Sequence, residues 1–400
     1  MSNGVSPSLP IVIAGAGIGG LTAALALRRK GHEVLLLERA EEVSEVGAGL
    51  QLSPNACHVL NQLGVLDALE PHAFAPENLR ISSGKTGTQL ARVPLGDFVR
   101  KRHGSPFWVI HRADLQQVLL QLVRETSGIT VQLASEVHSL ESSPYDHLLC
   151  KYEASGSPER LECSALIGAD GVWSKTRKLI PGHENARFSG QVAYRATIPI
   201  DQVPERWHGD SGLWLHKNAH LVHYQVRGGN ELNVVVLVAE PWEDETWSAR
   251  ADKETLKHAL KDWPTEILNL ISIPDQWLKW ALCSVDATGP WTHGHVALMG
   301  DAAHAMLPYM AQGAAMAIED AAILAKHLPA SAENIPASLR SFERQRKSRV
   351  AHIQAIARKN AQVFHFSGIP AIIRDTVLRY SKPEALTARF DDIYGWRSQQ

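Results

Sequence analysis

Hydrophobic residues near the start of the chain form two short continuous runs on either side of a segment with helical spacing. The runs, Ile11–Ala14 and Val34–Leu37, contain no alternating polar positions, which is typical of parallel strands buried on both faces. Residues 21–29 between them are mostly strong helix formers, with apolar side chains at helical spacing. The pattern therefore predicts a strand, a helix and a second strand.

The turn between the first strand and the helix carries Gly15, Gly17 and Gly20 in the spacing G-x-G-x-x-G. In that spacing the first glycine allows the tight turn, the second lets the backbone approach a pyrophosphate, and the third lets helix and strand pack closely. The helix start offers N–H groups to a phosphate, and Glu38 can accept hydrogen bonds from a ribose. A glycine triplet alone could serve only a tight turn, but its context favours dinucleotide binding.

Two acidic residues follow later buried strands, at the edge of the sheet where α/β proteins bind ligands. A strand predicted at 161–167 leads into Asp170, and one predicted at 295–298 leads into Asp301. Both positions are therefore candidates for ligand contacts.

Helix starts supply further candidates. Gln312 and Gly313 precede a helix predicted at 314–327, whose first N–H groups can bind a negatively charged oxygen. Arg112 lies where a strand predicted at 107–111 meets a helix, a common place for a ligand contact, and an ordinary surface arginine is the alternative. The glycines at 47 and 49 let a backbone pass close to something flat, or simply form a loop before a helix at 56–63.

The middle of the chain changes to the pattern of antiparallel strands. Strands are predicted at 192–199, 213–215, 221–226 and 232–239, a hairpin turn at 228–230, and helices at 253–262 and 266–271. This region predicts a second sheet domain with one face available to cover a ligand. Earlier strands, predicted at 129–136 and 148–153, precede the one at 161–167.

Composition narrows the classes of function. The 400 residues allow two intimately joined domains, and the net charge of −2 without a basic cluster argues against nucleic acid as a partner. Four cysteines without C-x-x-C spacing predict reduced thiols in the cytoplasm, and neither a metal site nor a disulfide framework. Neither a signal peptide nor a membrane helix is predicted, because no suitable apolar run occurs.

The last part of the chain predicts helices. Residues 335–366 have dense Arg and Lys, which indicates a solvated helix face. The tail at 391–396 contains Ile, Tyr and Trp, so we expect it to be docked on the protein.

The glycine turn, Asp170-Gly171 and Gly300-Asp301 stand in an order that resembles the group A flavoprotein aromatic hydroxylases, the family of p-hydroxybenzoate hydroxylase. The likeness is closer to salicylate hydroxylase, 3-hydroxybenzoate 6-hydroxylase and 6-hydroxynicotinate 3-monooxygenase, and it covers nearly the whole chain. The segments that carry it are GAGLQLSPNA, HRADLQ, LIGADGVWSKTR, GDAAHAMLPYMAQGAAMAIEDA and IYGW.

The resemblance implies an α/β fold: a Rossmann-like FAD-binding domain of the glutathione-reductase type, an interleaved mixed or antiparallel substrate sheet, and C-terminal helices. The implied boundaries are 1–77, 105–185 and 285–334 for the FAD-binding domain, 78–104 and 186–284 for the sheet domain, and 335–400 for the helical segment.

The resemblance also implies FAD bound without a covalent link. The implied cofactor contacts are Gly15, Gly17 and Gly20 at the pyrophosphate, Glu38 with Arg39 at the ribose, Arg112, Asp170, Asp301 at the ribityl chain, and Gln312 with Gly313 at the flavin ring. NADH or NADPH would reduce FAD transiently, since no second G-x-G-x-x-G occurs. O2 would then form a C4a-hydroperoxyflavin that hydroxylates a small aromatic, such as a hydroxybenzoate or an N-heteroaromatic. A monomer or a homodimer is expected.

His220 and Tyr224 are the candidate catalytic residues. They lie four apart, which places both on one face of a strand, with His223 on the other face. Their positions match the pocket histidine and tyrosine of the resembled subgroup, and a group with a suitable pKa would help to ionise a phenol. The alternative is a core histidine and a packed tyrosine.

Further candidates for contacts to a substrate come from three other segments. Tyr194 and Arg195 could bind a carboxylate, with a scaffold salt bridge as the alternative. Gln51 stands where some hydroxynicotinate-type relatives have a histidine base, so that proton route is missing. Pro308 completes the predicted pocket, and His304 is assigned a structural role.

Two other functions are compatible with single parts of the sequence. An NAD-dependent dehydrogenase would use the glycine turn and Glu38, but Gly300-Asp301 argues against it. A flavin-binding sensor or carrier without turnover would use the same motifs.

Overall fold

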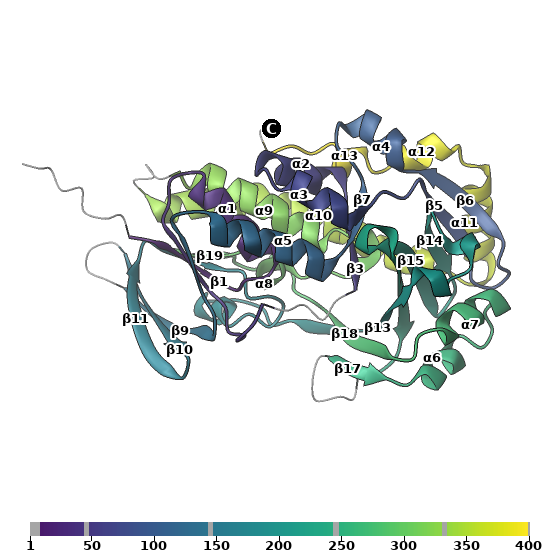
Figure 1. The fold of residues 1–400 in the computed structure, drawn as a ribbon, viewed down its shortest axis with the longest axis horizontal. Helices are drawn as coiled ribbons and strands as arrows, with labels where there is room; N and C mark the ends of the chain where they lie inside the picture. Colours follow the sequence, from purple (N-terminus) through teal and green to yellow (C-terminus); the bar gives the residue numbers. More distant parts are fainter. Residues whose placement is uncertain (1–8, 44–47, 143–146, 243–247, 330–333, 399–400) are drawn as a thin grey trace, which may run out of the picture.

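The computed structural model describes residues 9–43, 48–142, 147–242, 248–329 and 334–398. Gly47, one of the loop glycines, and the first eight residues lie outside these ranges. Figure 1 shows an elongated molecule with a helix-covered sheet at one end and a larger sheet at the other.

The first sheet has six strands in the order β19-β20-β12-β1-β2-β8, and its central strands are parallel. The strands are β1 (Ile11–Ala14), β2 (Val34–Leu37), β8 (Ile129–Gln132), β12 (Ala165–Gly168), β19 (Thr292–His293) and β20 (Val296–Leu298). Beside it, helix α1 (Ile18–Arg28) packs on both α5 (Arg112–Glu125) and α9 (Gly313–His327). The order brings the ends of β1, β12 and β20, which are far apart in sequence, to one edge.

A three-stranded hairpin sheet of β9 (Ser135–Ser142), β10 (Leu148–Ala154) and β11 (Ser157–Cys163) lies beside this core. The single strands predicted at 129–136 and 161–167 were wrong, because each is divided between two sheets. Ala134, at φ 48°, turns the chain between β8 and β9, and β11 ends before β12 begins. All four cysteines are free thiols, as predicted.

The larger sheet has eight strands in the order β17-β18-β13-β16-β15-β14-β5-β6. They are β5 (Asn78–Ser83), β6 (Gln89–Pro94), β13 (Arg187–Pro199), β14 (Ser211–Leu215), β15 (Ala219–Val226), β16 (Glu231–Ala239), β17 (Ser248–Ala251) and β18 (Trp277–Ser284). The predicted strands of the middle region are confirmed, while β17 and β18 were missed. The domain boundaries stay a prediction, although β5 and β6 join the strands of the middle region.

The two faces of the larger sheet have different neighbours. One face forms an apolar core with α6 (Lys253–Ala259) and α7 (Thr265–Ser272). The other face, called the inner face below, lies toward the small sheet of β3 (Gly49–Leu52), β4 (Ala73–Phe74) and β7 (Trp108–His111). Two bonds join the layers: Gly49 N–H donates to Asn233 Oδ1 at 2.8 Å, and Arg227 pairs with Asp114 at 2.6 Å.

The C-terminal segment begins with one 30-residue helix, α10 (Ile335–Phe364), followed by α11 (Gly368–Tyr380), α12 (Pro383–Ala388) and α13 (Asp391–Tyr394). The expectation that the basic residues of α10 form only a solvated face was wrong, since Arg346 is buried. The tail is docked as expected: Ile393 is buried, and Trp396 lies under the guanidinium groups of Arg346 and Arg349.

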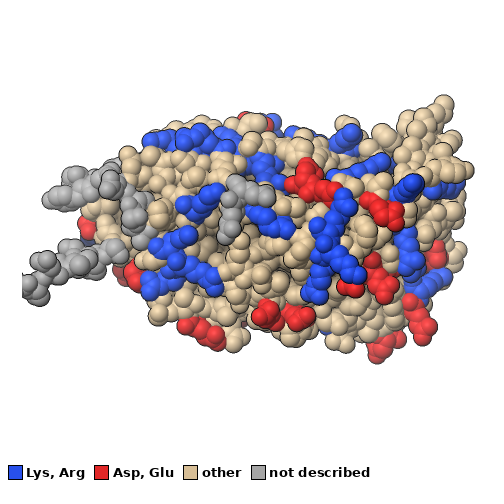
Figure 2. Space-filling view, turned by 90° about the horizontal axis from the view of Figure 1, so that it is seen from above, with Lys and Arg blue, Asp and Glu red and all other residues tan. Residues whose placement is uncertain are grey.

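The remaining helices are α2 (Pro54–Gln62), α3 (Leu66–Leu69), α4 (Gly96–His103) and α8 (Asp301–His304), with a 3₁₀ turn at Pro308–Met310. Among the described residues, no helix is both long and apolar enough to span a bilayer. On the face drawn in Figure 2, side chains of both charge signs are interspersed.

The fold class is confirmed by this architecture, an α/β core with an antiparallel-rich second sheet and C-terminal helices.

Candidate active site

The glycine turn has the geometry that the sequence predicts. Gly15 has φ +104°, and a Cβ on it would lie 2.6 Å from Ala169 O. A Cβ on Gly20 would lie 1.9 Å from Gly15 O, so helix and turn pack too closely for any side chain. Gly17 differs, because no heavy atom lies within 4 Å of the position of its Cβ. The turn therefore leaves open space in front of Gly17, at the N-terminus of α1, where a pyrophosphate fits.

Glu38 closes one side of this turn. One carboxylate oxygen accepts from Ala16 N–H at 2.8 Å, and the other accepts from Ala40 N–H at 2.9 Å. The carboxylate is thus fixed beside the glycine turn, where it could accept from a ribose. Arg39, directly after it, is exposed.

Asp170 lies at the end of β12 beside the glycine turn, but its carboxylate holds its own loop. It accepts from Ser174 Oγ at 2.5 Å, from the N–H groups of Lys175 and Thr176 at 2.9 Å, and from Thr176 Oγ1 at 3.0 Å. These bonds shape the loop that starts at Gly171, where a Cβ would again meet open space. The structure therefore gives Asp170 a positioning role in this loop, and its contact with FAD stays a prediction.

Contacts at Gly19 and Gly300 show that the Gly300-Asp301 motif lies beside the glycine turn. A Cβ on Gly19 would lie 3.2 Å from Ala317 Cβ and 3.6 Å from Met299, and one on Gly300 would lie 3.1 Å from Ala317 Cβ. Asp301 is exposed at the start of α8, and Gly313 at the start of α9 has open space at its Cβ position. Three separate chain segments thus converge, and their glycines leave a cradle that suits an extended dinucleotide.

The side chain of Gln312 is buried in a polar network, and the approach of Gln312 to the flavin ring stays a prediction. It donates to Ser53 Oγ at 2.9 Å and accepts from Asn55 at 3.1 Å. Because the side-chain amide of Gln312 is engaged in these bonds, its main chain is the part that could contact a flavin.

That network continues into a buried ion cluster which the sequence analysis missed. Arg346 of α10 pairs with Glu319 and Asp320 of α9, each at 2.6 Å, and Asp320 also bonds His304 at 2.6 Å and Gly300 N–H at 2.8 Å. Burial alone would raise the pKa of Asp320, but the charges of His304 and Arg346 lower it to about 2. The cluster fixes Gly300 against α9, and His304 has the structural role that we expected. The signal was available: two adjacent acids interrupt an otherwise apolar helix.

His220 and Tyr224 share the inner face of β15, as predicted. His223 lies on the other face, where the centre of its ring is 4.9 Å from the centre of the Trp207 ring. His220 is buried against Tyr309, Phe364 and His365, and its Nδ1 lies 3.1 Å from His365 Nε2. Burial lowers the pKa of His220 to about 3, with a smaller contribution from His365.

Tyr224 lies where the larger sheet meets β3. A Cβ on Gly49 would lie 2.4 Å from the Tyr224 ring, so only glycine allows β3 this close. Gln51 lies two residues further along β3 and therefore shares the face of Gly49, toward β15. Burial raises the pKa of Tyr224, and the charge of Arg195 opposes that rise.

Arg195 and Tyr194 are adjacent on β13 and face opposite ways. The Arg195 guanidinium lies 5.0 Å from the centre of the Trp280 ring on the inner face. Tyr194 is in the core of the other face and donates to Glu240 at 2.9 Å. The prediction of Tyr194 as a substrate contact was therefore wrong, because neighbours on a strand cannot both face one pocket.

Two other predicted residues border the same region. Pro308 begins the 3₁₀ turn whose Tyr309 packs on His220, and Arg112 begins α5 beside β3, with its N–H bonded to Ala48 O at 3.2 Å. His216, to which we assigned no role, directly follows β14, and its ring packs on the ring of Trp263.

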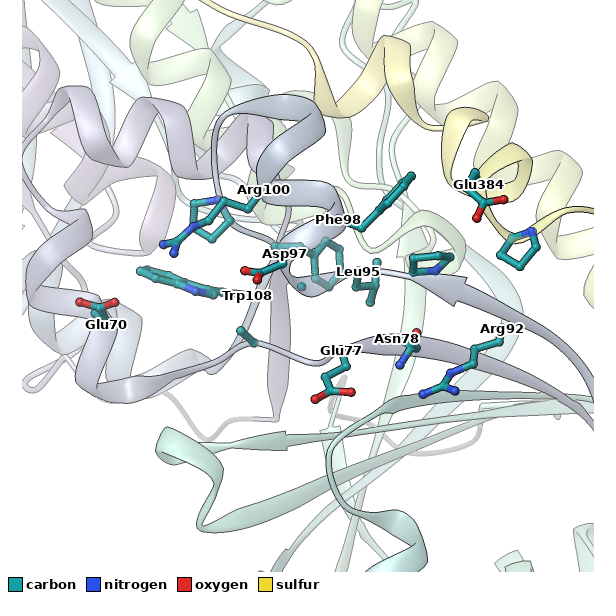
Figure 3. Close-up of a pocket in the computed structure, with 16 residues that line it drawn as sticks. Glu70, Glu77, Asn78, Arg92, Leu95, Asp97, Phe98, Arg100, Trp108 and Glu384 are labelled. Atoms are coloured by element: carbon teal, nitrogen blue, oxygen red, sulfur yellow. The ribbon is translucent and has the colours of Figure 1, made fainter.

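A separate cavity of about 810 Å³ lies between α4, β6, β7 and α12 (Figure 3). Its labelled lining mixes Arg92 and Arg100 with acids such as Glu70 and Asp97. No predicted site residue lines it, so the cavity is distinct from the glycine cradle and from the inner face.

Comparison with known proteins decides the family. Residues 8–357 match the family described as "FAD binding domain". The chain is 35% identical to the 3-hydroxybenzoate 6-hydroxylase of Polaromonas naphthalenivorans over 97% of its length and 96% of the relative's. The chain belongs to the FAD-dependent aromatic hydroxylases. The resemblance seen in the sequence is thus confirmed, and FAD is the cofactor of this flavoprotein monooxygenase.

Another hydroxylase of this family, the 6-hydroxynicotinate 3-monooxygenase of Pseudomonas fluorescens, is 32% identical over 89% of this chain and 92% of its own. The solved structure titled "Salicylate hydroxylase substrate complex" has a TM-score of 0.81 at 23% identity, covering 98% of this chain and 97% of that one. At that identity the structural likeness supports the fold alone.

Proposed function

We propose that this hydroxylase acts on a small aromatic ring that carries both a phenolic hydroxyl and a carboxylate, as in the hydroxybenzoates. The observation that carries the proposal is the common placement of His220, Tyr224 and Arg195 on the inner face of the larger sheet. A phenolic acid needs one cationic partner for its carboxylate and polar groups at its hydroxyl, and this face offers both. The name of the Polaromonas relative agrees with such a substrate.

Arg195 would bind the carboxylate. Its guanidinium is planar, always charged and suited to bidentate contacts. Trp280 beneath it holds the side chain in place and limits solvent around it. Across the sheet Arg195 pairs with Val235 of β16, and Val235 pairs with Val222 of β15. Val222 lies midway between His220 and Tyr224, so Arg195 is two strands away and equally placed toward both.

Tyr224 and His220 would act at the phenolic hydroxyl. Because burial raises the pKa of Tyr224, its hydroxyl stays protonated and can donate to a phenolate oxygen. His220 is neutral, and with Nδ1 engaged by His365 its Nε2 is the ring nitrogen left for a ligand. A bound anion would raise the pKa of His220 and make it a stronger proton acceptor.

FAD, when bound, would supply the activation of O2 and the transfer of one oxygen atom to the ring. The protein would hold FAD and the substrate in place and exclude water from the site. Gly15, Gly17 and Gly313 would face the dinucleotide, and β3, brought close by Gly49, would separate the inner face from solvent. NADH or NADPH would reduce the cofactor transiently.

An N-heteroaromatic substrate is the second candidate, because the Pseudomonas relative is named for one. Gln51 weighs against it, since glutamine cannot replace a titrating base at that position.

The experiment is a substrate screen of purified, FAD-loaded protein. Hydroxybenzoates, hydroxynicotinates and neutral phenols would each be tested for stimulated NADH and NADPH oxidation, O2 uptake and a product heavier by one oxygen. We expect a hydroxybenzoate to give coupled product. If only neutral phenols or hydroxynicotinates are hydroxylated, the proposed substrate class is wrong, and a flavin spectral shift without any product would favour a sensor.

A further inference from the structure

The C-terminal tail covers two neighbouring arginines of α10, and no step of the proposed reaction uses it. The centre of the Trp396 ring lies 5.2 Å from Arg349 Cζ and 5.6 Å from Arg346 Cζ. Arg349 also donates to two main-chain oxygens of the tail, Asp392 O at 3.2 Å and Ile393 O at 3.1 Å. The tail is therefore tied to the same side chains that enter the buried ion cluster.

Both arginines hold one carboxylate of α9. Arg349 forms a bidentate pair with Glu319 through hydrogen bonds of 2.6 and 2.7 Å, and Arg346 donates to Glu319 at 2.6 Å. Glu319 and Arg346 are buried, whereas the side chain of Arg349 is 14% exposed at the rim of the cluster. Ion pairs weaken where water raises the local dielectric. By covering the guanidinium groups, Trp396 keeps water from this pair.

From Glu319 the hydrogen bonds continue to the predicted flavin end of the FAD site. Glu319 Oε1 accepts from Asn55 Nδ2 at 2.7 Å, and the same nitrogen donates to Gln312 Oε1 at 3.1 Å. Gln312 directly precedes Gly313, the first residue of α9. The main chain that is expected to approach the flavin ring is thus held, through two side chains, by the carboxylate that Arg349 binds.

A second branch reaches the Gly300-Asp301 motif. Arg346 donates to Asp320 at 2.6 Å, and Asp320 accepts from Gly300 N–H at 2.8 Å. This bond fixes the main chain directly before Asp301, which is expected to contact the ribityl chain. The adjacent acids of α9 therefore hold both segments that are predicted to meet the flavin half of FAD.

We propose that the C-terminal tail positions the flavin end of the FAD site, with Trp396 and Arg349 acting through Glu319. Neither residue touches FAD, so both are positioning residues. Without the tail, water reaches Arg349 and weakens its pair with Glu319, and the hold on Asn55 and Gln312 weakens with it. The inference concerns the cofactor and does not depend on the identity of the substrate.

The alternative is a tail that serves only as packing. Its Tyr394 ring contacts the rings of His103 and Phe107, so the tail also buries apolar surface beside α4. Reciprocity separates the two roles. If docking of the tail raises the affinity for FAD, then FAD must favour docking of the tail by the same factor. A tail that serves only as packing is docked equally with and without FAD.

Hydrogen exchange of the wild-type full chain, FAD-free and FAD-loaded, measures this reciprocity without any substitution. The N–H groups of Ile393, Tyr394 and Gly395 are hydrogen-bonded to main-chain oxygens of the preceding residues, so their exchange reports opening of the tail. We expect FAD to slow exchange in the peptide that contains them by about tenfold. Equal exchange in the two forms would overturn the inference.

Titration of FAD-free variants with FAD, well below their unfolding temperatures, tests the route. Trp396→Ala should weaken FAD binding by about tenfold, and Trp396→Phe, which keeps a ring over the guanidinium groups, should recover most of the affinity. Asp392→Ala is the matched control: its side chain pairs with exposed His352 at 2.8 Å, and the substitution keeps the main-chain oxygen that Arg349 uses. It should bind FAD like wild type.

Two titration results would overturn the inference. Wild-type FAD affinity in folded Trp396→Ala would show that the tail serves only as packing. An equal loss of affinity in Asp392→Ala and Trp396→Ala would show that the effect does not run through the arginines beneath the Trp396 ring.

Discussion

His220 Nδ1 lies 3.1 Å from His365 Nε2, so a strand of the larger sheet and the end of α10 share one hydrogen bond at the inner face. Burial lowers the pKa of both histidines, and in a neutral pair one ring donates the proton that the other accepts. The tautomer of His365 therefore determines whether His220 Nε2 accepts or donates toward a ligand.

This relationship predicts that His365 positions His220. His365→Leu removes the partner of Nδ1, and we expect kcat to fall by about tenfold, the equivalent of one hydrogen bond of ~1.4 kcal/mol. His365→Gln keeps an amide at that place and should recover part of the rate. The readout is the pH profile of kcat at constant FAD content. An unchanged profile in His365→Leu would mean that the bond is only structural.

His220 and Tyr224 themselves should have larger effects. We expect His220→Ala and Tyr224→Phe each to slow hydroxylation by about 10²-fold or more, the range for a positioned acid or base, while FAD content stays intact. His223→Gln, on the other face of the same strand, is the matched control and should turn over normally. Normal, coupled product formation in both pocket variants would show that these residues do not act on the substrate.

Arg195 gives a prediction on specificity. Arg195→Met should raise KM for a hydroxybenzoate by about ten- to a hundredfold, since a hydrogen bond to a charged group contributes ~1.5–3 kcal/mol. The corresponding phenol without a carboxylate should be affected little. If both substrates lose affinity equally, Arg195 supports the scaffold and does not bind the carboxylate.

Two glycines of the first turn separate cofactor binding from folding. Gly17 has ordinary dihedral angles, φ −70° and ψ 176°, and open space at its Cβ position. Gly17→Ala should therefore leave the unfolding midpoint of the FAD-free protein unchanged but weaken FAD binding by about tenfold or more. Gly20→Ala should prevent stable folding, because its Cβ would meet Gly15 O at 1.9 Å. FAD titration and thermal unfolding measure the two effects, and unaltered FAD affinity in Gly17→Ala would place the pyrophosphate elsewhere.

Buried His223 predicts how stability depends on pH. Burial, with a smaller contribution from Arg80, lowers its pKa to about 3, although Asp210 opposes the shift. In the unfolded chain His223 is protonated as the pH falls below about 6.5, whereas in the folded protein it stays neutral down to about pH 3. The free energy of unfolding therefore falls as the pH drops from 6.5 toward 3. At pH 5 this costs about 2 kcal/mol relative to pH 7.5. His223→Gln should lose less stability than wild type between these pH values; equal losses would contradict the shift.

The sequence predicted the fold class and the three motifs because each has a local signature, such as Gly15 to Glu38 between two apolar runs. Predictions from the sequence were wrong for residues whose environment depends on tertiary packing. Arg346 looks like any other residue on a basic helix, and only the approach of α9 makes it part of a buried ion cluster. Tyr194 was misplaced for a simpler reason, because the alternation of a strand already excluded it once Arg195 was chosen.

A crystal structure with FAD and 3-hydroxybenzoate bound would show where the substrate ring lies in this protein. We predict that the aromatic ring lies between Gln51 and the inner face. Its hydroxyl should lie within hydrogen-bond distance of His220 or Tyr224, and its carboxylate should contact Arg195. A ring found in the cavity between α4 and α12, against Arg92 and Arg100, would show that the inner face is not the substrate site.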